Sequence, residues 1–245
     1  MTKLVKYSTH LKKQAKRIKE VRSGERTRQL LMAAAAELLE STTLRDLHVS
    51  AIRKPVKASQ GTFYIYFKDK YDLVAQLLRD YIEFELRTMP VLDEYEDIYD
   101  LNVDVHYWYA EMFRLNAGIM RCFIQLNDTS TEITELWQLR GEKIVGAIME
   151  FHANRYDLSA DEQNALRSAF HIMGNALDQI LSSMYGAATH SVFSFEKDRG
   201  MILELYSTLM LRAVYGENPK LKTNSPAKLL TKIKFKRKTA RRKSA

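Results

Sequence analysis

The chain has 245 residues, 46% of them hydrophobic, a single cysteine and a formal net charge of +8. It lacks the run of about 18 apolar residues that a membrane-spanning helix needs, and no apolar stretch follows the basic N-terminus, so neither a transmembrane segment nor a signal peptide is predicted. Because the lone Cys122 cannot form an intrachain disulfide, we expect a buried thiol and a cytoplasmic protein.

The chain begins with a strongly basic stretch. Residues 1–28 hold ten lysines and arginines against two glutamates. Because basic side chains that neutralise phosphates release bound counterions, we interpret residues 1–23 as a basic N-terminal arm, flexible or loosely helical, that assists contact with DNA. A solvated tail is the alternative. Leucines and alanines at helical spacing then predict a first helix over residues 24–40.

Two short helices joined by a tight turn are predicted next. Apolar residues at spacings of three and four give residues 48–54 one buried face. Ser59 stands where an N-cap belongs and opens a second helix over residues 59–66. Phe63 and Phe67 lie four apart on its inner side, whereas hydroxyl and amide side chains occupy its outer side. Such a helix suits the major groove of a DNA duplex, and an ordinary helical hairpin is the alternative.

The stretch from Ser59 to Leu73, SQGTFYIYFKDKYDL, resembles the TetR family, in which a Ser-Lys-Gly-Thr-Leu-Tyr-x-(His/Tyr)-Phe run is followed by Lys and a leucine-bearing helix. Residues 28–39 are similar to that family's first helix, so the resemblance covers about residues 26–80. It implies an all-α fold, with a three-helix helix-turn-helix head over residues 24–70 and a larger helical ligand-binding and dimerisation body over residues 71–217. The DNA-binding residues predicted in this way are Ser50, Lys57, Ser59, Gln60, Gly61, Thr62, Tyr64, Tyr66 and Lys70.

The turn between the two short helices departs from the family pattern. Lys57 stands where the family usually has glycine, which is favoured there because the turn needs a left-handed backbone. Pro55 lacks a backbone donor and disfavours helical geometry at Lys54. The loop over residues 40–46 lacks the usual glycine-aromatic pair, and Gln60 replaces a lysine that would contact phosphate. These departures predict a reshaped turn and a changed angle of the second helix.

Capping residues and apolar spacing predict the helices of the body. Asp69 is a candidate N-cap, and Ser159 with Glu162 three residues later forms a capping box. The resemblance implies that the last two long helices pair with their copies in a second subunit, which makes a homodimer. The predicted segments are a helix over 70–88, one or two helices from about 98 with a break near Gly118, a turn at 127–130, and helices over 131–155, 159–185 and 194–215, of which 160–185 and 194–215 form the dimer interface.

The resemblance also implies a small-molecule pocket inside the body. The methionine and aromatic content of this region favours an effector that is largely apolar. Each candidate is also explained as plain core, and a single histidine among them is more often a hydrogen-bonded core residue than a ligand. The candidate pocket residues are Tyr107, Trp108, Met112, Phe113, Met120, Phe123, Trp137, His171 and Met173.

The C-terminal end is the second basic region. Residues 218–245 hold eleven lysines and arginines and no acidic residue, so residues 29–217 carry a net charge of −11. We expect a disordered basic tail, with a short amphipathic piece at 229–235, that contacts DNA without sequence specificity. RNA, an anionic membrane surface or plain solvation are the alternatives.

No catalytic motif emerges from the sequence. It contains no phosphate-binding loop, no His-Glu-x-x-His motif, and no pair of histidines at helical metal-binding spacing. We therefore expect neither an enzyme nor a cofactor. The predicted function is a dimeric transcriptional regulator, a repressor that binds a palindromic operator in double-stranded DNA and is released by a small ligand. The alternatives are a DNA-binding structural protein of nucleoid or division type, which uses its basic ends, and a helical interaction or membrane-surface protein.

Overall fold

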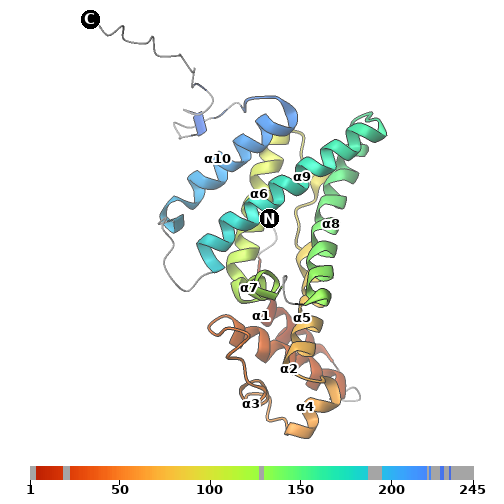
Figure 1. Cartoon of the computed structure of the whole chain (residues 1–245), viewed down its shortest axis with the longest axis vertical. Helices are drawn as coiled ribbons and strands as arrows, with labels where there is room; N and C mark the ends of the chain where they lie inside the picture. Colours follow the sequence, from red (N-terminus) through yellow and green to blue (C-terminus); the bar gives the residue numbers. More distant parts are fainter. Residues whose placement is uncertain are drawn as a thin grey trace, which may run out of the picture.

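The computed structural model describes residues 4–18, 23–126, 130–186 and 195–219, together with positions 221, 227, 228 and 232. Over these residues the regular elements are all helices, as the sequence predicted. Figure 1 shows a small head at one end and a larger body at the other, with α5 running from the first into the second. The head and its flanking helices are α1 (Tyr7–Arg17), α2 (Ser23–Leu39), α3 (Val49–Arg53), α4 (Gln60–Tyr66) and α5 (Lys70–Leu86).

The body contains five longer helices and two short elements. Its first two helices are separated at Asn116, two residues before the predicted break at Gly118. The capping box predicted at Ser159 and Glu162 is confirmed, with both reciprocal hydrogen bonds present. The elements are η2 (Leu92–Glu94), α6 (Ile98–Leu115), α7 (Ala117–Leu126), α8 (Thr131–Ala153), α9 (Ala160–Leu181), η3 (Ser182–Gly186) and α10 (Phe195–Tyr215).

The core of the head is apolar. Leu31 on α2, Ile52 on α3 and Phe63 on α4 are fully buried, and Phe67 and Leu73 close the same cluster from the side of α5. The two predicted N-caps are confirmed: the Ser59 hydroxyl accepts from the Thr62 backbone N–H, and the Asp69 carboxylate accepts from two backbone N–H groups. The capped α4 is therefore held on the head by its inner aromatic side chains.

The predicted N-terminal arm is different in the structure. Residues 7–17 form the regular helix α1, which packs against α2. Tyr7 and Leu11 are buried, and the Tyr7 ring lies 5.0 Å from the Phe84 ring of α5. The Tyr7 backbone N–H donates to the Asn116 side chain at 2.7 Å. This segment is a packed helix and not a flexible or loosely helical arm, because its apolar residues recur at helical spacing among the lysines.

Head and body touch closely where α7 begins. A Cβ at Gly118 would lie 2.3 Å from the Leu39 carbonyl oxygen at the end of α2, so any larger residue would push the two helices apart. Arg121 donates to the same carbonyl at 3.1 Å. The head is thus fixed to the body by α5, by α7 and by α1.

Two predictions fall on residues that the structure does not describe. The turn at 127–130 lies outside the described residues except for Ser130, and so does most of the basic tail at 218–245. None of the described helices is long and apolar enough to cross a membrane.

Candidate nucleic-acid interface and body pocket

The turn between α3 and α4 is not reshaped in the way that the missing glycine predicted. Lys57 adopts φ 56°, in the left-handed region that favours glycine. Its N–H donates to the Lys54 carbonyl and the Ala58 N–H donates to the Arg53 carbonyl, both at 3.2 Å. This pair of bonds is a Schellman motif, in which the left-handed residue ends the helix. The turn therefore keeps a glycine-type shape with a lysine in it.

The effect expected of Pro55 is not found. Lys54, which precedes it, keeps right-handed helical angles of φ −56° and ψ −52°, and its N–H donates to the Ser50 carbonyl. The bias against helical geometry before proline is offset here by this bond and by the Schellman bonds that follow. Pro55 lies in the turn that follows α3, and the prediction of distorted geometry at Lys54 was wrong.

The outer face of α4 is open to solvent. Gln60 and Gly61 at its start are exposed, Tyr64 is 51% exposed, and Ile65 is 75% exposed. Ile65 was not among the predicted DNA contacts, although its place next to Tyr64 on the outer side of the helix could have indicated that it is exposed there. An exposed isoleucine and tyrosine beside amide and backbone donors suit the methyl groups and polar base edges of a major groove.

Three predicted residues are partly engaged within the head. The Ser59 and Thr62 hydroxyl oxygens lie 2.8 Å apart as part of the N-cap. Tyr66 is half-buried and points to the start of α2, where a Cβ at Gly24 would lie 3.1 Å from its hydroxyl oxygen. The capping role of Ser59 and Thr62 orients α4, and it leaves the exposed Ser50 and Tyr64 as the more accessible polar groups.

Lys70 faces the interior of the head. Its ammonium donates to the backbone carbonyls of Leu44, Arg45 and Leu47 at 2.9, 2.8 and 2.9 Å. An ammonium has three N–H donors, so these bonds use all of them. The structure thus gives Lys70 a role in holding the loop before α3, where sequence reasoning had predicted a phosphate contact.

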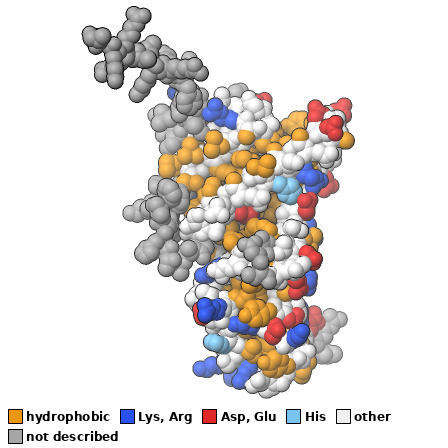
Figure 2. Space-filling model, in the orientation of Figure 1, with side chains coloured by type: hydrophobic (Ala, Val, Ile, Leu, Met, Phe, Trp, Pro, Cys, Tyr) orange, Lys and Arg blue, Asp and Glu red, His pale blue; other side chains and the backbone are white. Residues whose placement is uncertain are grey.

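Other cations surround α4. Arg45, Lys54, Lys57 and Lys68 are all exposed. Figure 2 shows Lys and Arg side chains at the lower end of the molecule, near α3. Phosphate contacts fix the register of a protein on DNA, and cations at both ends of α4 are placed for that task. Only Lys57 of these four was predicted, because the family pattern does not mark the others.

The body contains a small pocket of about 100 Å³ between α6, α8, α9 and α10. Trp108 and His171, two of the predicted residues, line it. Its walls are mostly apolar, with a few polar side chains from α6, α8 and α9. The lining residues are Val105, His106, Trp108, Tyr109, Arg140, Gly141, Ile144, Val145, Ile148, Phe170, His171, Gly174, Asn175, Leu177, Asp178, Tyr206 and Met210.

The other predicted pocket residues lie elsewhere. Met112, Phe113, Met120 and Phe123 are fully buried in the general core. The remaining three, Tyr107, Trp137 and Met173, are half-buried and do not line the pocket. Apolar spacing identifies the inner face of a helix, but neighbouring residues on that face can point to the core or to a cavity, and the sequence does not distinguish them.

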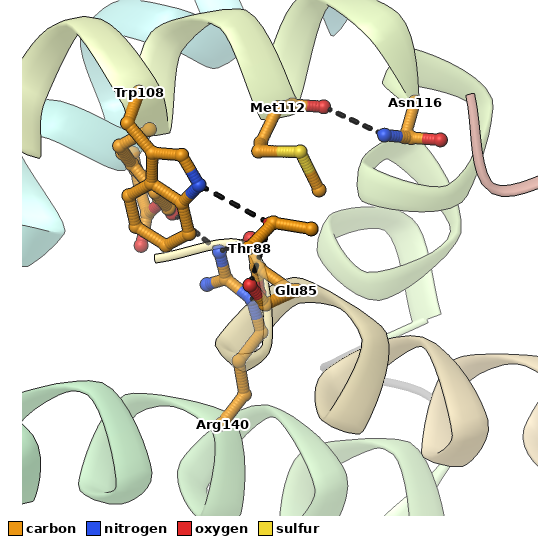
Figure 3. A network of polar contacts seen from close by, with 8 residues as sticks. Glu85, Thr88, Trp108, Met112, Asn116 and Arg140 are labelled. Carbon is orange, nitrogen blue, oxygen red and sulfur yellow. Dashed lines mark hydrogen bonds and ion pairs between the residues drawn. The ribbon is translucent and has the colours of Figure 1, made fainter. Parts of the chain in front are cut away.

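A buried polar network borders the pocket (Figure 3). The Arg140 guanidinium donates to both carboxylate oxygens of Glu85, at 2.7 and 2.8 Å, and to the Tyr109 hydroxyl at 2.7 Å. The Tyr109 hydroxyl in turn donates to Asp178 Oδ1. Burial raises the pKa of the Asp178 carboxyl. Sequence reasoning missed Glu85, Arg140 and Asp178, although a charged residue inside an otherwise apolar helical face was a signal for each.

The same network reaches α5 a second time. The Trp108 indole N–H, in the pocket wall, donates to the Thr88 hydroxyl just beyond the end of α5 at 3.2 Å (Figure 3). Glu85 belongs to the last turn of α5 itself. Arg140 and Trp108 in the pocket wall are therefore bonded to α5 and to the residues that directly follow it.

Comparison with known proteins points to one family. The family model described as bacterial regulatory proteins, tetR family, matches residues 31–77. The HTH-type transcriptional regulator EthR of Mycobacterium tuberculosis strain ATCC 25618 / H37Rv is 24% identical over 205 residues, which are 80% of this chain and 90% of that protein. EthR of Mycobacterium bovis matches with the same values.

Two solved structures share the fold. A putative TetR-family transcriptional regulator from Mesorhizobium loti has a TM-score of 0.59 and 13% identity, over 78% of this chain and 97% of that chain. RolR in complex with resorcinol has a TM-score of 0.52 and 18% identity, over 80% of this chain and 90% of that chain. These likenesses extend the agreement from the head to the helical body.

Proposed function

We propose that the chain is a DNA-binding transcriptional regulator of the TetR family and that it acts as a repressor; the family model over residues 31–77 and the related proteins support this. In this proposal two copies bind a palindromic operator, and a small ligand in the body releases them. The observation that carries the proposal is the outer face of α4, where Gln60, Gly61, Tyr64 and Ile65 are exposed between surface cations. A capped helix with such a face is suited to the major groove.

The body offers a surface for a second copy. α9 has 22 residues, but only Phe170, Leu177 and Leu181 are buried, and Ile172 on its outer side is 68% exposed. Leu209 on α10 is also exposed, and Figure 2 shows hydrophobic side chains gathered over α9 and α10. Because one head covers only half of a site, a homodimer through these two helices would give the two-fold symmetry that a palindrome needs.

The pocket is positioned to influence the head. A ligand that moves Arg140 or Trp108 would also move their partners Glu85 and Thr88, at the end of α5. The other end of α5 packs on the head and would shift the two recognition helices away from successive grooves. This is a coupling between two sites, which requires that the ligand bind the two arrangements with different affinity. RolR, which shares the fold, was solved with a small ligand, and this supports a small-molecule effector.

The proposed function needs neither an active site nor a cofactor, and it places the protein in the cytoplasm together with the DNA that it regulates. The experiment is binding of the full chain to genomic fragments, including its own promoter region, across a salt series. We expect one discrete site that is still preferred at high salt and a two-to-one stoichiometry of chain to site. Uniform weak binding that disappears with salt would contradict the proposal and favour a non-specific structural role.

A further inference from the structure

The buried polar network beside the pocket holds more acidic than basic groups. Glu85 and Asp178 supply two carboxylates, whereas Arg140 supplies one guanidinium, and Tyr109 joins them as a neutral hydroxyl. His171, which also lines the pocket, lies 3.1 Å from Glu142, so any charge on its ring already has a partner. A buried site with more carboxyl than guanidinium groups favours a cation, because a bound positive charge stabilises the ionised form of the second carboxyl.

One carboxylate oxygen of Asp178 is available to a ligand. Its Oδ1 accepts from Tyr109, whereas no hydrogen bond reaches Oδ2 from the described part of the chain. Asp178 lines the pocket, and burial raises the pKa of its carboxyl even though the Arg140 guanidinium and the Tyr109 hydroxyl act to lower it. A bound ammonium would supply the missing charge and the missing donor together.

His106 provides a second acceptor. The Ser207 hydroxyl donates to the Leu203 carbonyl at 2.8 Å, so its oxygen must accept from His106 Nδ1, also at 2.8 Å. The proton is therefore on Nδ1, and Nε2 carries a lone pair. Burial lowers the pKa of His106 to about 3, so the ring is neutral at physiological pH. His106 is 6% exposed and lines the pocket, and no partner of Nε2 is found among the described residues.

The rest of the pocket suits one ring. Trp108, Phe170 and Tyr206 supply aromatic walls, which attract cations as well as apolar groups. Gly141 on α8 and Gly174 on α9 face open space, with no atom within 4 Å of where a Cβ would stand. The volume of about 100 Å³ is of the order that a single benzene-sized ring requires.

From these contacts we propose that the pocket binds a small amine with one aromatic ring, as a cation. Its ammonium donates to Asp178 Oδ2 and to His106 Nε2, and its ring lies against Trp108 and Phe170. The effect of the amine on DNA binding rests on the proposed function, whereas binding of the amine to the pocket does not depend on that function. Phenols and carboxylic acids of the same size are the competing ligand classes.

Three probes of equal size separate these classes: benzylamine, benzyl alcohol and benzoate. We would measure their affinity for the full chain by calorimetry without DNA. We expect benzylamine to bind at least tenfold more tightly than benzyl alcohol and no binding of benzoate, which the carboxylates repel. Equal or tighter binding of the alcohol or of benzoate would overturn the proposal.

Two pairs of variants locate the site. Asp178→Asn keeps an acceptor for Tyr109 but removes the charge, and it should weaken benzylamine binding at least tenfold, whereas Asp161→Asn on the exposed start of α9 should not. Gly141→Leu fills the pocket and should abolish binding, whereas Gly146→Leu on the same helix lies outside the lining and should not. Unchanged binding in both Asp178→Asn and Gly141→Leu would overturn the proposal.

DNA release is a separate readout. Benzylamine that binds but leaves the complex with DNA intact would uphold this ligand class and contradict the proposed release by a ligand. Absence of benzylamine binding in a chain that still recognises one DNA site would overturn the ligand class and leave the DNA-binding function standing.

Discussion

The head and the body are both helical, but they hold their interiors together by different chemistry. In the head, Phe63 and Phe67 pack in an apolar core, and the inward cation Lys70 bonds only to neutral backbone carbonyls. In the body, Arg140 and Glu85 form an ion pair that is almost completely buried. The apolar core of the head thus holds its outer surface in one shape. The body instead contains a buried charged network of Glu85, Arg140 and Tyr109, called the seam below, that a charged ligand can disturb.

The largest effect should come from breaking that seam. Arg140→Met leaves the Glu85 carboxylate buried without its partner, and we expect a loss of about 3–5 kcal/mol in the free energy of unfolding, measured by urea denaturation. The double variant Arg140→Met with Glu85→Leu should recover most of this loss, because the Glu85 carboxylate is no longer buried without its partner. A single variant as stable as the wild type would show that the seam is not a closed charge network.

The corresponding change in the head tests the inward cation. Lys70→Met removes three charge-assisted bonds, and we expect a loss of about 2–3 kcal/mol in unfolding free energy. The matched variant Lys68→Met, at an exposed position, should leave stability unchanged and lower the salt dependence of DNA binding by about one phosphate contact. The reverse pattern would make Lys70 the phosphate contact that the sequence predicted.

Acid should affect the body through His106. Its pKa is lowered to about 3 in the folded chain by burial, from an ordinary value of 6.5. Below pH 6.5 His106 therefore binds a proton in the unfolded chain but not in the folded chain, and the free energy of unfolding falls as the pH decreases. Between pH 6.5 and pH 4.5 we expect the wild type to lose about 2 kcal/mol more than His106→Gln, measured by urea denaturation at both pH values. Equal losses would show that this ring does not remain neutral.

The turn of the head should give the smallest effect. Lys57→Gly removes the steric cost of a Cβ in the left-handed conformation, and we expect a gain of about 1 kcal/mol in the free energy of unfolding. Lys54→Gly, three residues earlier in a right-handed conformation, should instead lose about 1 kcal/mol. Thermal unfolding of both variants checks the difference in sign, and a loss in both would mean that Lys57 is not strained.

The same contrast explains what the sequence could predict. Ser59, Asp69 and the capping box at Ser159 act on neighbours a few residues away, so local spacing was enough to place these helix starts. The departures from the family pattern had predicted a reshaped turn, whereas Lys57 keeps the left-handed backbone of the glycine that it replaces.

Contacts between distant residues were beyond this reasoning. Lys70 bonds to carbonyls more than 20 residues earlier, and Arg140 lies 55 positions from Glu85. Tyr7 was assigned to an arm because the lysines around it dominate the composition, whereas its partner Asn116 lies 109 positions away. The prediction of the pocket residues was mostly wrong because the cavity is formed by side chains of several helices that are distant in the sequence. Met112 and Trp108 share one helix face, but only Trp108 borders the cavity.

The central claim, that the outer face of α4 reads DNA, is tested most directly by one pair of tyrosines. Tyr64 is 51% exposed on α4 and Tyr71 is 55% exposed at the start of α5. We would measure the affinity of Tyr64→Ala and Tyr71→Ala for the best genomic site, at a fixed salt concentration. Tyr64→Ala should lose at least tenfold in affinity for that site, with unchanged stability and unchanged non-specific binding, whereas Tyr71→Ala should lose less than threefold. Wild-type affinity in Tyr64→Ala would contradict the account.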